Sequence, residues 1–121
     1  MYIRALRGAT TVELNEKEEI FSASEEMFAE IMKQNELDPE DIASIIFSLT
    51  PDLDAAFPAA AIRRMGITDV PLLDVAQPQI KGALKKCIRV IVHINTNKKN
   101  NELKHVYLRG ARVLRPDLSN K

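Results

Sequence analysis

An arginine lies in the middle of the most apolar stretch of this sequence, residues 84–94. The stretch is rich in Ile and Val, which favours a central β-strand, and strand alternation places Arg89 on one face with Cys87, Ile91 and His93. A guanidinium keeps its charge at any physiological pH. It is therefore tolerated at such a position only beside a carboxylate, a water-filled cleft or an anionic ligand. The pattern predicts an anion site around Arg89.

Two further residues have the chemistry to join such a site. Arg7 ends a strand predicted over residues 2–7, and Tyr107 lies in a strand predicted over residues 104–108. Guanidinium groups together with a phenol suit a small ligand that carries more than one carboxylate. Arg7 also fits a strand-end residue that reaches water, so the residue types alone leave a binding module and an enzyme open.

Other chemistries lack support in the sequence. There is no glycine-rich phosphate loop, no metal-ligand spacing around His93 and His105, and no nucleophile paired with a histidine in a supporting context. We therefore expect neither a metal nor a cofactor, and we interpret both histidines and the single cysteine, Cys87, as structural residues.

Composition limits the class of protein. The 121 residues are 45% hydrophobic, which fits one domain spanning residues 1–121. Seventeen basic residues balance 17 acidic ones, so no overall field favours nucleic acid or an anionic membrane as a partner. The apolar runs are shorter than the roughly 20 residues of a membrane helix, and the first residues resemble a strand more than a signal peptide. We expect a cytoplasmic protein.

Hydrophobic periodicity predicts an α+β fold with a mixed sheet. The expected helices cover residues 15–34 and 58–65, with a turn or two at 38–41, and the expected strands cover residues 2–7, 43–50, 70–75, 84–94 and 104–108.

Particular residues set the expected boundaries of these elements. We expect Asn15 and Glu18 to cap the first helix, Gly8 to end the first strand, and Pro71 to confine residues 70–75 to an edge of the sheet. A solvated turn at residues 95–101 should make the fifth strand antiparallel to its predecessor. Pro116 breaks the last apolar stretch, which we expect to be a partly ordered tail.

Five segments carry a resemblance to a known family: RALRGATTVE at 4–13, TPDLDAAFPA at 50–59, LKKCIRV at 84–90, HVYL at 105–108 and RVLRPDL at 112–118. Together they strongly resemble the monofunctional, trimeric AroH-type chorismate mutases of bacteria, at matching spacing along the whole chain. The resemblance implies a pseudo α/β-barrel homotrimer, an architecture similar to that of RidA-like enamine and imine deaminases, with active sites between subunits. It also implies rearrangement of chorismate to prephenate, toward phenylalanine and tyrosine, without a cofactor or covalent intermediate.

The resemblance also implies roles for particular residues. Arg89 matches the arginine aimed at the ether oxygen of the substrate, and Arg7 and Tyr107 match residues that hold its carboxylate. Arg63 matches an arginine near the anionic end, and Arg115 belongs to a tail that covers the site. The remaining implied contacts form the pocket wall and the hydroxyl end, namely Phe57, Leu72, Leu73, Asp74, Val75, Ala76, Gln77 and Leu114.

The sequence departs from the family pattern near the substrate hydroxyl. Gln77 stands where many members have a glutamate, and Ala60 replaces a longer side chain found in some members. Asp74 occupies a variable position nearby, so one hypothesis is that the acid has moved from position 77 to position 74. The Gln77 substitution also leaves an alternative, a non-catalytic or regulatory trimer that binds an aromatic-pathway carboxylate. A deaminase is a further alternative, against which the segments around Arg89 and Arg115 argue.

Overall fold

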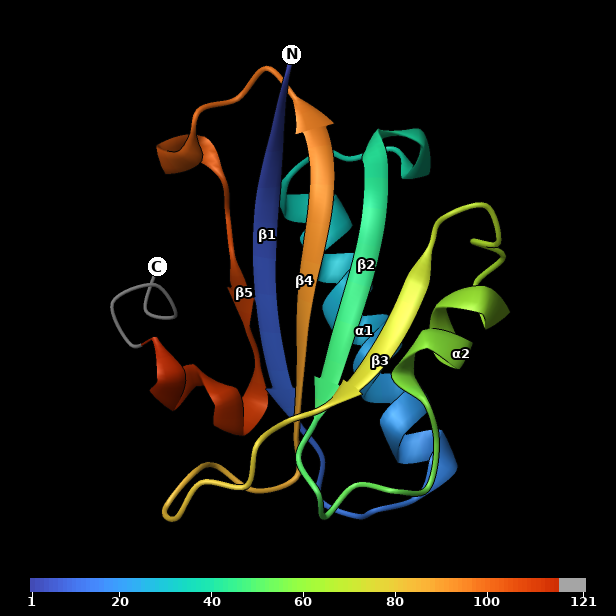
Figure 1. Ribbon diagram of the computed structural model, residues 1–121, viewed down its shortest axis with the longest axis vertical. Helices are drawn as coiled ribbons and strands as arrows, with labels where there is room; N and C mark the ends of the chain where they lie inside the picture. The colour runs from blue at the N-terminus through green and yellow to red at the C-terminus, as the bar shows by residue number, and fades with distance from the viewer. Residues whose placement is uncertain (116–121) are drawn as a thin grey trace.

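The computed structural model describes residues 1–115 and contains one mixed sheet of five strands in the order β3-β2-β4-β1-β5. The strands are β1 (Tyr2–Thr11), β2 (Ile42–Leu49), β3 (Leu72–Ala76), β4 (Cys87–Thr96) and β5 (Val106–Tyr107). The helices are α1 (Lys17–Gln34) and α2 (Pro58–Arg64), with 3₁₀ turns η1 (Pro39–Asp41), η2 (Asn100–Glu102) and η3 (Arg109–Leu114). Figure 1 shows α1 behind the sheet and α2 beside β3. The predicted α+β class is confirmed.

Strand β4 is the centre of the sheet, as predicted. It pairs antiparallel with β1 on one side and with β2 on the other, although it begins at Cys87 and not at residue 84. Its β-branched residues alternate between two environments: Ile88, Val90, Val92 and Ile94 are buried, whereas the residues between them are partly exposed. One face of the sheet is therefore packed, and the other, which we call the open face, is partly exposed.

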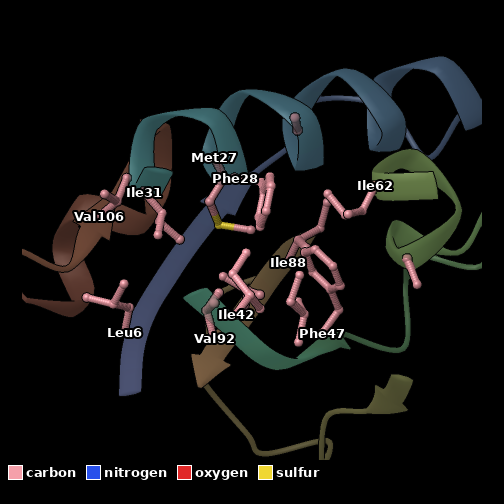
Figure 2. Packing of buried hydrophobic residues seen from close by; sticks show 14 of the residues in the cluster. Leu6, Met27, Phe28, Ile31, Ile42, Phe47, Ile62, Ile88, Val92 and Val106 are labelled. Carbon is pink, nitrogen blue, oxygen red and sulfur yellow. The ribbon is translucent and has the colours of Figure 1, made fainter. Parts of the chain in front are cut away.

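The packed face is covered mainly by α1. Its apolar residues recur at the helical period, as expected, and Ile20, Ala23, Met27, Phe28 and Ile31 are all buried. Figure 2 shows Met27, Phe28 and Ile31 of α1 above residues of the sheet, with Ile62 of α2 closing the same cluster. No helix within residues 1–115 is long and apolar enough to cross a membrane.

Gly8 does not end the first strand, because β1 continues through it to Thr11. A Cβ at position 8 would lie 2.9 Å from Cδ1 of Ile31 and 3.0 Å from Cγ1 of Val90. The glycine is thus required by the close approach of α1 to the sheet and not by a turn.

The expected cap of α1 is also wrong. Asn15 donates to the carboxylate of Asp54 at 2.7 Å and accepts from the N–H groups of Asp54 and Ala55, both at 3.1 Å. The helix begins at Lys17, and its N-cap residue Glu16 makes no side-chain cap bond. The loop after β2 competes for the same side chain and offers it two N–H groups.

The fifth strand pairs with a different neighbour from the one expected. β5 runs opposite to β4, as predicted, but it pairs in parallel with β1. Both edges of β4 are already occupied, so the returning chain can join only the free edge of β1.

The edge position of β3 is confirmed. In the expected tail, η3 buries Ala111, and residues 116–118 lie outside the described residues.

Candidate active site on the open face of the sheet

The register of the sheet brings the predicted residues Arg89 and Tyr107 into one row. Arg89 is paired with Ser48 on β2 and with Ala9 on β1, and Ala9 is paired with Tyr107 on β5. Directly paired residues point to the same face of a sheet. Because the neighbours Ile88 and Val90 point into the core, this row lies on the opposite face of the sheet, where Ala9 and Tyr107 are covered by Ala111 of η3 and Arg89 is partly exposed.

Arg7 lies on the same face, one step along β1. Its cross-strand partner is Ile91, which in turn faces Ile46 and then Leu73 across β2 and β3. Arg7 is exposed, whereas Ile46 and Ile91 are partly buried. Arg7, Arg89 and Tyr107 therefore share one surface, with apolar side chains between them and the edge strand β3.

Two polar atoms of this surface are buried without a hydrogen-bond partner among the described residues. They are Nε of Arg89 and the hydroxyl of Tyr107, and Tyr107 as a whole is only 5% exposed. A buried donor left unpaired costs about 1–3 kcal/mol, so native proteins almost always satisfy such groups. Among residues 1–115, both atoms are thus left available to a further polar group.

Cys87 lies beside Arg89 and has the character of a structural thiol. It packs with Ala9, Tyr107 and Ala111 in a small cluster under η3. Burial raises the pKa of the Cys87 thiol, and the charge and hydrogen bond of Arg89 offset this only in part. The thiol is therefore protonated near neutral pH, which is unfavourable for a nucleophile.

A hydrogen-bond network that sequence reasoning missed fixes the start of β4. The Thr50 hydroxyl donates to the Asp52 carboxylate at 2.5 Å and accepts from the N–H of Cys87 at 2.9 Å. Asp52 also accepts from the N–H of Lys86 at 2.9 Å, where the backbone adopts a positive φ of 48°. The signal was present in the Thr-Pro-Asp turn after β2. The network holds the backbone two residues before Arg89.

Gln77 lies just beyond β3 and lines a cavity of about 650 Å³ together with Thr50, Asp52 and the loop that leads to β4. Its backbone N–H donates to the carbonyl of Leu49 at 2.8 Å, but its side-chain oxygen Oε1 is buried without a partner among residues 1–115. Gln77 is therefore held at the end of β2, and its side-chain oxygen remains available to accept a hydrogen bond.

Asp74 lies on the opposite face from the Arg89 row, because it is paired with Phe47, a core residue. Its carboxylate accepts from the N–H of Ala59 in the first turn of α2, at 3.1 Å. Burial raises the pKa of Asp74, although the Ala59 N–H and the charge of Arg63 oppose the increase. This arrangement argues against the hypothesis that Asp74 replaces an acid at position 77.

The remaining predicted residues fall into two places. Leu114 packs against the cluster of Cys87 and Tyr107, and the charge of Arg115 acts on His105 next to β5. A second group lies around β3. A cavity of about 210 Å³ beside this strand is lined by Phe57, Asp74, Val75 and Ala76. Arg63 and Leu73 are exposed, and Leu72 packs against the main core. Figure 1 shows that β5 and η3 lie at one side of the sheet, and β3 and α2 at the other.

Comparison with known proteins supports a single family. A profile described as chorismate mutase type I matches residues 3–118. The chorismate mutase AroH of Bacillus subtilis (strain 168) is 43% identical over 120 residues, which cover 98% of this chain and 94% of the relative. The AroH protein of Thermus thermophilus is 40% identical over 119 residues, which cover 98% of each chain. A solved chorismate mutase from Clostridium thermocellum is 48% identical with a TM-score of 0.90, covering 91% of this chain and 98% of that one.

Proposed function

The chain belongs to the type I chorismate mutase family, and we propose that Arg89 is the residue with which it accelerates the rearrangement of chorismate to prephenate. The enzyme is an isomerase of aromatic amino-acid biosynthesis. The observation that carries the proposed mechanism is the Nε of Arg89, which is buried on the central strand β4 without a hydrogen-bond partner among residues 1–115.

The chemistry requires a fixed cation and no proton transfer. As the carbon–oxygen bond of the enol ether breaks, negative charge grows on the ether oxygen. A guanidinium N–H that already points to this position stabilises the transition state more than the substrate, and it needs no reorganisation during the reaction. Arg89 suits this task because the backbone before it is held by Thr50 and Asp52.

Arg7 and Tyr107 are proposed to bind a carboxylate of the substrate. Arg7 supplies an exposed guanidinium and Tyr107 a hydroxyl without a partner in the described part of the chain, both on the face that carries Arg89. Holding the carboxylate restrains chorismate in the compact conformer in which the two reacting carbons approach each other. That restraint lowers the entropic part of the barrier.

A homotrimer is proposed to complete each site. The residues predicted to touch the substrate lie near two opposite edges of one sheet, one group around β5 and the other around β3. The group around β3, with Phe57 and Arg63, is best supplied by a neighbouring copy. The exposed apolar side chains Phe57, Leu73 and Val75 support burial against another subunit, since they are 67%, 56% and 41% exposed. We also propose a single domain over residues 1–121 and a cytoplasmic location.

The direct test follows loss of the diene absorbance of chorismate with the wild-type protein and with Arg89→Ala and Arg89→Lys. We expect the alanine variant to lose roughly 10²–10³-fold in kcat, as for removal of one preorganised donor, and the lysine variant to recover only part because it lacks the planar fork. Arg64→Ala is the matched control, since Arg64 instead pairs with Glu18 and Glu25 of α1.

The outcomes separate the candidate roles. An Arg89→Ala variant that keeps wild-type kcat contradicts the electrostatic role of Arg89. A wild-type protein that binds chorismate without converting it would favour the regulatory alternative, for which the glutamine at position 77 is the supporting observation. Gln77→Glu would then be the next variant to assay.

A further inference from the structure

Strand β5 is very short, although it carries Tyr107. Its parallel ladder with β1 consists of two residue pairs, Gly8 with Val106 and Ala9 with Tyr107. Beyond the ladder the N–H of Leu108 donates to the carbonyl of Ala9 at 2.9 Å. In this register the next acceptor for the N–H of Arg7 would be the carbonyl of Lys104.

That carbonyl is already bound by another side chain. Asn35, at the end of α1 and only 3% exposed, donates to the carbonyl of Lys104 at 2.8 Å and accepts from its N–H at 2.9 Å. The N–H of Arg7 donates instead to Nδ1 of His105, at 2.9 Å. The imidazole thus replaces a backbone acceptor, and it can do so only while Nδ1 carries no proton.

We propose that His105 is a positioning residue, whose neutral imidazole completes the β1–β5 ladder and so holds Tyr107 beside Arg7 for the substrate carboxylate. The inference rests on the proposed function for the roles of Arg7 and Tyr107. It assigns to His105 no contact with the reacting atoms. His105 acts indirectly, because it accepts a hydrogen bond from the N–H of Arg7 and so fixes the position of β5.

The charges around His105 favour its neutral form. Burial lowers its pKa below the ordinary value of 6.5, and the positive charges of Arg115 and Arg7 lower it further. The cavity of about 780 Å³ beside it is also lined by Glu30 of α1, Glu102 of η2, Lys104 and Arg112 of η3. Protonation of His105 would bring two N–H donors against each other and add a positive charge beside Arg7.

The test compares His105→Asn with His105→Leu. The Oδ1 of an asparagine occupies nearly the place of Nδ1 and accepts a hydrogen bond, but it does not titrate. We expect His105→Leu to raise KM by about tenfold, which corresponds to the loss of one hydrogen bond. The kcat of this variant should stay within about threefold of the wild-type kcat. We expect His105→Asn to keep the wild-type KM at neutral pH and to lack the rise in KM that we expect of the wild type once the pH falls below the ordinary histidine pKa of 6.5 and His105 becomes protonated.

The other histidine provides the matched control. His93 lies on β4, and its Nδ1 is 3.0 Å from the hydroxyl of Ser44, so His93→Asn should leave both KM and its pH profile unchanged. An acid rise in KM that persists in His105→Asn, or a His105→Leu variant with wild-type KM, would overturn the positioning role.

A second readout does not depend on catalysis. In a ¹⁵N NMR titration of the wild-type protein, His105 should be the tautomer protonated at Nε2, and the amide signal of Arg7 should shift with the same midpoint as the ring. Detection of a proton on Nδ1 at neutral pH would overturn the inference. If the titration behaves as expected but Arg7→Ala leaves KM unchanged, the carboxylate role within the proposed function fails while the ladder contact stands.

Discussion

Asp74 and Gln77 are three positions apart, yet they have different partners. The Asp74 carboxylate is bound to the N–H of Ala59 at the start of α2, whereas the side-chain oxygen of Gln77 is buried without a described partner. The chain therefore uses the acid to attach α2 to β3. It leaves the amide available at the cavity next to the start of β4.

Replacing Asp74 by asparagine tests this structural role. Because the pKa of Asp74 is raised in the folded protein, ionisation of the carboxyl costs native stability once the pH exceeds its ordinary value of 3.8. Asparagine keeps an acceptor for Ala59 and removes that charge. We expect the free energy of unfolding in urea at pH 7 to be unchanged or to rise by less than about 1 kcal/mol, because the partly exposed site is screened by solvent.

The comparison variant is Asp74→Ala, which loses the acceptor and should be destabilised by about 0.5–2 kcal/mol. The gap between Asp74→Asn and the wild type should shrink toward pH 3, where the acid itself becomes protonated. If asparagine destabilises the protein as much as alanine does, then the charge of Asp74 and not its acceptor attaches α2.

Single residues differ in how far the sequence determines their role. Arg89 could be singled out as a candidate anion-binding residue from its own strand, since a permanent charge between β-branched residues needs a partner. Asp74 could not, because its partner Ala59 lies 15 positions earlier in another element. The same limit applies to His105, which the sequence presents only as a histidine within a predicted strand.

At the scale of elements, Thr50 connects the end of β2 to the start of β4. Thr50→Val removes the hydroxyl but keeps the shape of the side chain, and it leaves the buried N–H of Cys87 without its acceptor at 2.9 Å. We expect the free energy of unfolding to fall by about 1–3 kcal/mol, the cost of an unsatisfied buried donor, measured in urea at pH 7. Thr68→Val, at an exposed position, is the control and should change stability by no more than about 0.5 kcal/mol.

The same network predicts a dependence on acid. Burial raises the pKa of Asp52, but the hydrogen bonds from Thr50 and Lys86 outweigh this, and the net pKa lies below 3.8. A lowered carboxyl pKa stabilises the folded state above the ordinary value, and this stability is lost as the pH falls through the lowered one. Thr50→Val should therefore flatten the stability profile below pH 4, and an unchanged profile would contradict the network.

Elements were predicted well where one local pattern decides, and poorly where two compete. The apolar stripe of α1 and the β-branched run of β4 each have a single favourable burial. Asn15 had a choice between the end of α1 and the loop after β2, and the chain after β4 had a choice between two neighbours. Rules that use only neighbouring residues do not include a partner that is distant in sequence. They therefore predicted the wrong cap for α1 and the wrong neighbour for β5.

At the scale of the whole molecule, the face of the sheet opposite α1 is covered only in part within residues 1–115. Ile46 and Ile91 are only partly buried on it, and the atoms of Arg89 and Tyr107 that lack a partner among the described residues lie in the adjacent row. The resemblance of the whole chain to a family implied the α+β fold, which the structure confirms, and also a homotrimer. No local pattern counts subunits, so the assembly is a proposal that needs its own experiment.

Mixed assemblies of two inactive variants test whether one site draws on two copies. Arg89→Ala and Arg63→Ala remove residues that lie at different sides of the sheet within one chain. In the proposed trimer with the site between neighbours, random co-assembly of equal amounts places both intact arginines in about a quarter of the sites. We expect co-expressed, co-purified mixtures to recover about that fraction of wild-type kcat, while each variant alone stays low.

Mixing the two variants after separate purification, without unfolding, is the control and should recover activity only as fast as subunits exchange. Sedimentation of the same samples reports their assembly state, and specific activity should fall on dilution wherever the trimer dissociates, because the separated chain keeps Arg89 but loses the neighbour's Arg63. Restoration must therefore follow co-assembly. Trimers of mixed composition that remain as inactive as the single variants would show that Arg89 and Arg63 act within one chain or in separate sites, and the shared site would have to be abandoned.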